Sequence, residues 1–151
     1  MPALVAGLEP CLVRTSTISL AVRLMQKRIL IADDHVDAAD STGALLSLDG
    51  RFEVRVVYDG LQAVEIGRIF EPDLVLLDIN MPGMDGYEAA RIMRSEQPPN
   101  RRLVLVALTG RTSQEDVDRA CGCGFDLHLS KPVALGALNH LVASILESNR
   151  V

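Results

Sequence analysis

The stretch LVLLDINMPGMDG, residues 74–86, decides the fold of this chain. Four apolar residues lead into an acidic one, Asp78, and Pro82 and Gly83 follow as a turn signal. A run this short and this rich in Leu and Val is typical of a strand covered on both faces, because a buried helix needs more residues. The sequence therefore predicts a strand over 74–77 that carries Asp78 at its carboxyl end.

Four other runs have the same character: 28–32, 52–58, 103–108 and 125–129. Segments with helix-like patterns separate them. Strands that alternate with helices in this way form a parallel sheet with right-handed connections. We therefore predict one α/β domain over 27–148, a doubly wound five-stranded parallel sheet flanked by five helices.

Three of the intervening segments have apolar or small residues at helical spacing. The buried faces predicted from this spacing are Leu135, Leu138, Val142 and Ile145 in one segment, Ala38, Thr42, Leu45 and Leu46 in another, and Val117, Ala120 and Cys121 in a third. The third face is thin, and Thr112 and Glu115 precede it as a capping box. We expect this helix to be only partly committed to the core, so that it can shift at low cost.

Composition excludes several classes of protein. The chain has 151 residues, a net charge of −5 and 48% apolar residues, which suits a globular domain whose main partner is not nucleic acid, because DNA binders carry a basic face. No apolar run approaches the roughly 18–20 residues of a membrane span. Three cysteines without framework spacing are typical of reduced thiols, so we expect a cytoplasmic protein. We expect the arginines at 91, 94, 101 and 102 to form a solvated face.

Residues 1–26 differ from the rest of the chain. They contain Pro2, Gly7 and Pro10 and no clear period, and no charged segment of a signal peptide precedes the apolar residues. We interpret them as an N-terminal extension that is poorly ordered or that precedes an alternative start at Met25. A helix packed on the domain or on a partner is the other interpretation.

Polar residues follow four of the five predicted strands. Asp33 and Asp34 follow the first, Asp78 the third, Thr109 the fourth and Lys131 the fifth. Ligands of open α/β sheets bind at the carboxyl ends of the strands. We therefore expect three carboxylates, one hydroxyl and one ammonium to meet at one edge of the sheet.

Such a group of side chains suits phosphoryl transfer. Three neighbouring carboxylates repel one another unless a cation is present, and Mg²⁺ prefers oxygen ligands and takes only one or two carboxylates. A lysine can hold a phosphoryl oxygen, a threonine can donate a hydrogen bond to another, and the remaining carboxylate can attack phosphorus. Each residue alone is ordinary in a turn or a helix cap. Their joint occurrence in this order is the informative feature.

At these positions the sequence resembles the receiver domain of two-component signalling, over about residues 27–147. The motifs are ILIADD at 29–34, LDINMPGMDG at 77–86, ALTG at 107–110 and SKP at 130–132. The resemblance implies the flavodoxin-like receiver fold with strand order 2-1-3-4-5. It also implies a bacterial, cytoplasmic phosphoacceptor that catalyses only its own phosphorylation and dephosphorylation and is not otherwise an enzyme.

The resemblance implies an acceptor, a donor and a metal. Asp78 would receive the phosphoryl group from a histidine kinase or a histidine phosphotransfer protein. Mg²⁺, which Mn²⁺ can replace, would be bound by Asp34, Asp78 and the backbone carbonyl of Asn80, with Asp33 acting through water.

It also implies a switch. Lys131 would bind the phosphoryl group, its peptide bond to Pro132 would be cis, and Thr109 would turn toward the phosphoryl group. The surface of the fourth helix, the fifth strand and the fifth helix would then change and contact a downstream protein. His128 stands where the family has Tyr or Phe. Either it is a polar, titratable switch residue, or it fills the same volume and swings in the same way as the aromatic residue, or simply faces solvent; we favour the second interpretation.

Other interpretations remain. A haloacid-dehalogenase-like phosphatase also uses an aspartate nucleophile, but it needs a second aspartate where this chain has Asn80. A receiver-fold binding module that works without phosphate would lack one of the acidic, Thr or Lys residues. The chain is either a stand-alone receiver, which we favour because residues 1–27 do not resemble a linker, or the receiver of a hybrid kinase. We expect a monomer or a weak dimer.

Overall fold

The computed structural model describes residues 26–110 and 114–148 of the chain. The predicted extension over 1–26 lies outside these residues except for Gln26, and so does Thr112. The described elements run from Lys27 to Ser148 and alternate between strand and helix. No helix in this part of the chain is long and apolar enough to cross a membrane.

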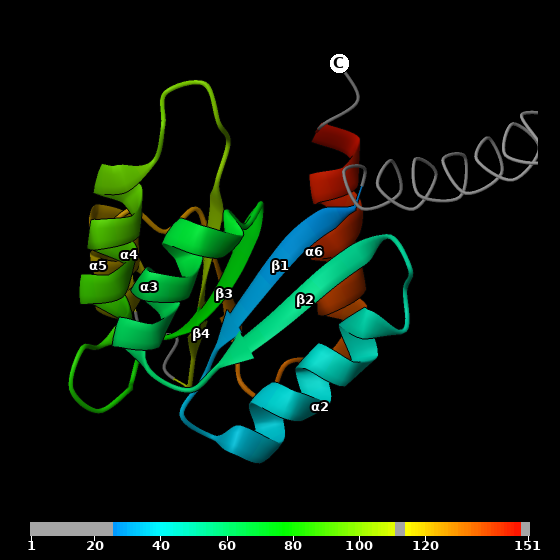
Figure 1. The fold of residues 1–151 in the computed structure, drawn as a ribbon. Helices are drawn as coiled ribbons and strands as arrows, with labels where there is room; N and C mark the ends of the chain where they lie inside the picture. Colours follow the sequence, from blue (N-terminus) through cyan, green and yellow to red (C-terminus); the bar gives the residue numbers. More distant parts are fainter. Residues whose placement is uncertain (1–25, 111–113, 149–151) are drawn as a thin grey trace, which may run out of the picture.

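Five parallel strands form one sheet in the order β2-β1-β3-β4-β5 (Figure 1). The strands are β1 Lys27–Ala32, β2 Phe52–Val57, β3 Leu74–Asp78, β4 Val104–Thr109 and β5 Leu127–Ser130. The described helices are α2 Val36–Ser47, α3 Gly60–Phe70, α4 Gly86–Glu96, α5 Gln114–Gly122 and α6 Leu135–Ser148. The predicted fold class and strand order are confirmed.

Helices cover both faces of the sheet (Figure 1). Buried residues of α3, α4 and α5 form one core with side chains from one side of the strands, and buried residues of α2 and α6 form a second core on the other side. The central strands β3 and β4 are buried along their whole length. Continuous Leu and Val runs, rather than alternating ones, are the consequence of this double cover.

Strand ends differ from the prediction by one or two residues. The largest difference is at β5, which begins at Leu127 instead of residue 125. Phe125 is buried, and its backbone N–H donates to the carbonyl of Ala120 at 3.1 Å, so it closes the end of α5 instead of starting the strand. A hydrogen bond to the preceding helix therefore decides this boundary, and the apolar run does not reveal it.

The predicted face of α2 was only partly correct. Leu46 is buried as expected and Thr42 is half-buried, but Ala38 and Leu45 are exposed, and the other buried residues are Ala39 and Gly43. A Cβ atom at Gly43 would lie 2.7 Å from Val56 Cγ2 of β2, so the missing side chain allows the helix to approach the sheet. Packing against the sheet rather than apolar content sets the orientation of this helix.

The other two faces were partly correct. In α6 the expected Leu138, Val142 and Ile145 are buried together with Leu141, but Leu135 is 54% exposed. In α5 Ala120 is buried and Val117 is half-buried, but Cys121 is exposed, and the buried thiol is that of Cys123 just after the helix. The described part of α5 therefore has few buried residues, in line with the thin face predicted for it.

The arginines expected on a solvated face divide into two pairs. Arg91 and Arg102 are exposed, but Arg94 and Arg101 are half-buried. Arg94 donates to the backbone carbonyls of Leu103 at 2.9 Å and Gly124 at 2.6 Å. It therefore joins the end of α4 to the segments that enter β4 and β5, a role that local sequence does not indicate.

Candidate functional site

Strand register brings the residues predicted for the site together. Ala32 of β1 pairs with Leu77 of β3, so the next residues, Asp33 and Asp78, stand side by side at the carboxyl edge. On the other side of β3, Asp78 pairs with Leu108, which places Thr109 one residue further along β4. Both aspartates are only 3% exposed. Two carboxyl groups from separate strands therefore share one buried location.

Lys131 lies against both of these carboxylates. Its Nζ is 2.8 Å from Asp78 Oδ2 and 3.1 Å from Asp33 Oδ2. Thr109 pairs with Ser130 across β4 and β5, and the backbone N–H of Lys131 donates to the carbonyl of Thr109 at 2.9 Å. The peptide bond between Lys131 and Pro132 is cis.

The electrostatics of the site favour the uptake of positive charge. Burial raises the pKa of Asp78 to about 6; the neighbouring Asp33 carboxyl also raises it, and Lys131 lowers it only in part. For Lys131, burial by itself lowers the pKa, but the hydrogen bonds to Asp78 and Asp33 outweigh burial, and the pKa rises above its usual value. The ammonium is therefore held charged beside an aspartate that is costly to ionise.

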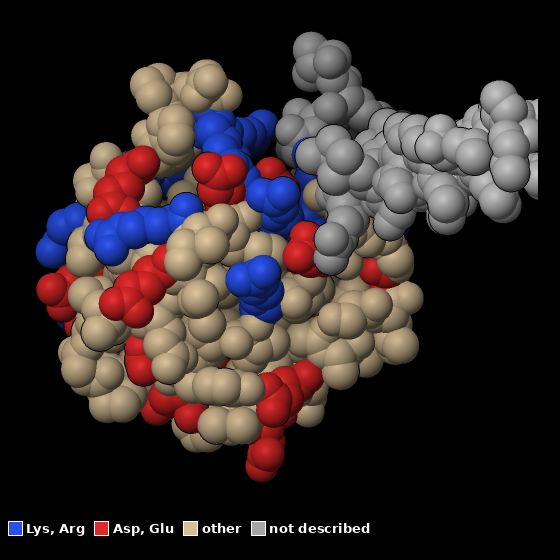
Figure 2. Space-filling model, viewed as in Figure 1, with Lys and Arg blue, Asp and Glu red and all other residues tan. Residues whose placement is uncertain are grey.

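The face of the molecule drawn in Figure 2 agrees with this local balance. Its lower edge, where the strands of Figure 1 end, carries acidic side chains and no basic ones. The basic side chains of this face lie higher, close to acidic ones. On this face, negative charge is therefore least compensated at the edge where the strands end.

Backbone groups fix the orientation of the two buried carboxylates. The N–H of Asn80 donates to Asp78 Oδ1 at 3.1 Å, and the N–H of His35 donates to Asp33 Oδ1 at 2.9 Å. The loop after Asp78 closes tightly, since a Cβ atom at Gly86 would lie 2.3 Å from the carbonyl oxygen of Asp78. Only glycine fits this approach without displacing backbone.

The residues fit a hard divalent cation. Asp33, Asp34, His35 and Asp78 each offer a ligand atom, and these atoms all lie within 4.8 Å of one another. Asp34 Oδ1 is buried and has no hydrogen-bond partner. A buried carboxylate oxygen without a partner is costly, and an oxygen-binding cation such as Mg²⁺ would satisfy it. The carboxylates of Asp33, Asp34 and Asp78 outnumber the ammonium of Lys131. A divalent cation would neutralise the excess negative charge.

Two predicted residues lie apart from this group. His128 is in β5, opposite Ala107, and its side chain is exposed. The side chain of Asn80 is exposed, so only its backbone is part of the arrangement. The sequence analysis did not name one neighbour of this group, His35. It is 77% exposed, yet its Nδ1 is 3.6 Å from Asp34 Oδ1 and 3.7 Å from Asp33 Oδ1; its place directly after Asp34 was the available signal.

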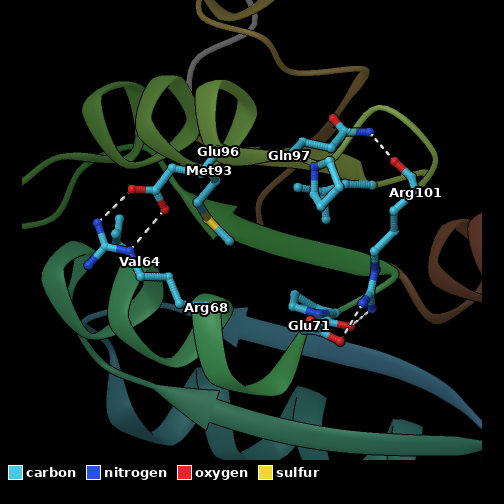
Figure 3. A pocket seen from close by; sticks show the side chains of 11 residues that line it. Val64, Arg68, Glu71, Met93, Glu96, Gln97 and Arg101 are labelled. Carbon is cyan, nitrogen blue, oxygen red and sulfur yellow. Dashed lines mark hydrogen bonds and ion pairs between the residues drawn. The ribbon is translucent and has the colours of Figure 1, made fainter.

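A hollow of about 200 Å³ lies elsewhere, between the ends of α3 and α4 (Figure 3). Its charged side chains pair with each other: Arg68 binds Glu96 at 2.7 Å, and Arg101 binds Glu71 at 2.7 Å. Since helices α3 and α4 end where β3 and β4 begin, the hollow is at the edge opposite Asp78. It adds no reactive group to the site.

Comparison with known sequences identifies the family. The sequence profile of the response regulator receiver domain matches residues 29–143. The chain belongs to this family. Residues 33, 34, 78, 109 and 131 of this receiver domain all lie within the matched range.

Curated relatives are response regulators and a sensor protein. The receiver domain is 36% identical over 108 residues to the DNA-binding response regulator MtrA of Mycobacterium tuberculosis, which covers 72% of this chain and 45% of MtrA. It is 34% identical over 128 residues to the sensor protein EvgS of Escherichia coli, which covers 81% of this chain and 10% of EvgS. The chain thus spans less than half the length of these relatives.

Solved structures give the same family. The receiver domain of a signal transduction histidine kinase from Syntrophus aciditrophicus is 31% identical, with a TM-score of 0.71 over 82% of this chain and 92% of that one. The receiver domain of Ssk1, crystallised with the histidine phosphotransfer protein Ypd1 of Saccharomyces cerevisiae, matches with 28% identity and a TM-score of 0.71, over 78% of this chain and 87% of that chain. This chain is therefore a signalling domain of the two-component type.

Proposed function

We propose that this receiver domain accepts a phosphoryl group on Asp78 from the phosphohistidine of a histidine kinase or a histidine phosphotransfer protein. The observation that carries the proposal is the position of the Asp78 carboxylate, buried at the end of a central strand with Lys131 Nζ 2.8 Å from its Oδ2. A carboxylate held beside a fixed cation is suited to attack phosphorus, because phosphoryl transfer depends mainly on position and charge neutralisation.

In the proposed step an Asp78 oxygen forms a bond to phosphorus while the bond from phosphorus to the histidine nitrogen breaks. The imidazole of the donor leaves and takes up a proton. Lys131, already within hydrogen-bond distance of Asp78, would hold one phosphoryl oxygen, and Thr109 would donate to another. The domain catalyses only its own phosphorylation and dephosphorylation.

The metal in this proposal is Mg²⁺, for which Mn²⁺ can substitute. Asp34, Asp78 and the backbone carbonyl of Asn80 would hold it, and Asp33 would act through water. The buried Asp34 Oδ1 that lacks a hydrogen-bond partner supports this assignment. When bound, the ion supplies positive charge for the phosphoryl oxygens.

A surface switch completes the proposal. The phosphoryl group adds about −1.5 to −2 of charge, and Thr109 would move toward it and draw α5 along. The few buried residues of α5 and the exposed His128 and Leu127 of β5 support an output surface over α5, β5 and α6 for a downstream protein. The side chain of His128 is exposed here, and its part in the switch stays a prediction.

The relatives support the choice of donor. EvgS is a sensor protein, and the matched structures include a histidine kinase receiver and a receiver crystallised with a histidine phosphotransfer protein. A location in the cytoplasm, the absence of nucleic acid among the partners and a monomeric or weakly dimeric state stay predictions.

Two other functions have less support. A haloacid-dehalogenase-like phosphatase needs a general acid two residues after the nucleophile. This chain has Asn80 at that position, and an amide side chain cannot donate a proton as an acid. A module that signals without phosphate would lack one of the acidic, Thr or Lys residues, and all of them are present in this chain.

The test is incubation with acetyl phosphate and Mg²⁺, followed by intact-mass measurement. We expect the mass to rise by one phosphoryl group in the wild-type chain and not at all in Asp78→Asn. Asp37→Asn, which changes an exposed carboxylate on α2, is the matched control and should be modified like the wild type. A full mass gain in Asp78→Asn would place the acceptor elsewhere, and steady turnover of p-nitrophenyl phosphate would favour the phosphatase.

A further inference from the structure

His35 stands at the open side of the acidic group. It occupies the N-cap position of α2, but its side chain makes no capping hydrogen bond. Its Nδ1 is instead 3.6 Å from Asp34 Oδ1 and 3.7 Å from Asp33 Oδ1. The imidazole is 77% exposed, whereas the Asp33 side chain beside it is 5% exposed. The imidazole therefore has a nitrogen next to two carboxylate oxygens and is accessible from solvent.

The carboxylate oxygens divide into two sets. Oδ2 of Asp33 and Oδ2 of Asp78 both contact the ammonium of Lys131. Oδ1 of each accepts a backbone N–H, from His35 and Asn80, and the buried Asp34 Oδ1 has no hydrogen-bond partner. Nδ1 of His35 adjoins two of these three Oδ1 atoms, those of Asp33 and Asp34. Together they form a donor group of three oxygens and one nitrogen.

The spacing is close to that of ligands on a single metal ion. With metal–ligand bonds of about 2.0–2.2 Å, two neighbouring donors lie roughly 3.0–3.4 Å apart. The nitrogen–oxygen separations of 3.6 and 3.7 Å need to shorten by only a few tenths of an ångström. An exposed side chain such as that of His35 can make this adjustment by rotating about its own bonds.

A nitrogen donor changes which cation such a centre prefers. Carboxylates and water suit Mg²⁺, whereas imidazole favours transition-metal ions such as Ni²⁺ and Zn²⁺. The other two histidines cannot have this effect, because His128 is in β5 and His140 is in α6, and neither belongs to a cluster of potential ligands in the part of the chain that the structure describes.

We propose that His35 sets the metal preference of this centre, its Nδ1 binding the cation that Asp34 and Asp78 hold directly and Asp33 holds through water. The domain then binds transition-metal ions more tightly, relative to Mg²⁺, than the three carboxylates alone would. This inference rests on the proposed function, since the cation is the one that supports phosphorylation of Asp78. Binding through Nδ1 requires a neutral imidazole that carries its proton on Nε2.

The experiment measures Ni²⁺ and Mg²⁺ affinities separately by isothermal titration calorimetry, on the whole chain without phosphate. Four chains are compared: the reference, His35→Ala, His140→Ala as the matched histidine control, and Asp34→Asn. All carry Cys11→Ser and Cys121→Ser, because thiolates also bind Ni²⁺. X-ray absorption at the nickel edge is recorded for each, since an imidazole ligand has a recognisable scattering pattern.

We expect His35→Ala to weaken Ni²⁺ binding by at least about tenfold, since even outer-sphere partners of a metal ligand are worth that much, and to remove the imidazole scattering. Mg²⁺ affinity should change by less than about twofold, and His140→Ala should leave both affinities unchanged. If His35→Ala weakened the affinities for Ni²⁺ and Mg²⁺ equally, the role of His35 would be overturned. The same holds if His35→Ala changed neither affinity while Asp34→Asn abolished Mg²⁺ binding, because the metal centre would then exist without His35. Unchanged Mg²⁺ binding in Asp34→Asn would instead overturn the metal centre of the proposed function.

Discussion

The two edges of the sheet differ in how well their charged side chains are paired. At the carboxyl edge the carboxylates of residues 33 and 78 share the ammonium of Lys131, and the carboxylate of residue 34 lies beside them. At the amino edge three acids each pair with an arginine: Glu96 with Arg68, Glu71 with Arg101 and Asp126 with Arg94. Charges paired one to one hold neighbouring segments together. An excess of one sign in a buried place leaves a binding capacity that a cation or a reacting group can use.

The largest effect is expected from glycines at the two edges. In Gly86→Ala the new Cβ would meet the Asp78 carbonyl oxygen at 2.3 Å, and backbone cannot move away cheaply. We expect the free energy of unfolding to fall by about 3 kcal/mol in urea denaturation. In Gly67→Ala the Cβ meets only the flexible end of Met93, at 2.8 Å, so the change should stay within about 1 kcal/mol. Equal losses in the two variants would contradict this difference.

The second effect concerns the shared ammonium. Lys131→Met removes the cation that contacts Asp78 and Asp33, so phosphorylation by acetyl phosphate should slow on the order of 100-fold. Arg68→Met removes a cation of the amino edge and should leave the rate unchanged. The rates are read from the growth of the phosphorylated mass with time. A wild-type rate in Lys131→Met would mean that the ammonium has only a structural role.

The third effect is a pH dependence of stability. The folded pKa of Asp78, about 6, is above its usual 3.8, so the folded state binds the proton more tightly than the unfolded one. This group therefore lowers stability as the pH rises from about 4 to about 6, and the loss is complete above that range. With a chelator present at pH 7.5, Asp78→Asn should raise the free energy of unfolding by about 1–3 kcal/mol.

The control for this prediction is the same pair of chains at lower pH. At pH 5 the advantage of Asp78→Asn should shrink, because the wild-type carboxyl is then mostly protonated in the folded state. Urea denaturation at the two pH values gives both free energies. An advantage that grows as the pH falls would show that the pKa is shifted in the other direction.

The smallest effect belongs to the exposed pairs of the amino edge. Glu96→Gln breaks the ion pair with Arg68, whose guanidinium holds the pKa of Glu96 below its usual value. Both side chains are largely exposed, so we expect only a slight loss of stability, which disappears at about 1 M salt. Thermal melts at low and high salt measure it. A large loss that salt does not reduce would mean that the pair is worth more than its exposure suggests.

Much of the candidate site could be predicted because the signals are short-range and lie at the ends of strands. Asp33, Asp34, Asp78, Thr109 and Lys131 each follow an apolar run, and parallel register brings such positions together whatever the helices do. The buried faces of the helices were harder to predict from the sequence, as Leu45 and Leu135 illustrate. Both have the correct spacing, and both are exposed, because the shape of the sheet decides which side of a helix is covered.

The sequence by itself determined the order of the elements, the class of the sheet and the residues that end its strands. These depend on runs of apolar side chains and on topology rules that act between neighbouring elements. The tertiary structure alone decided which oxygen of Asp34 is left without a partner, how near His35 comes to the acids, and which carbonyls Arg94 binds. These are distances between atoms, some on segments far apart in the chain, and packing of the whole domain sets them, so no local pattern encodes them.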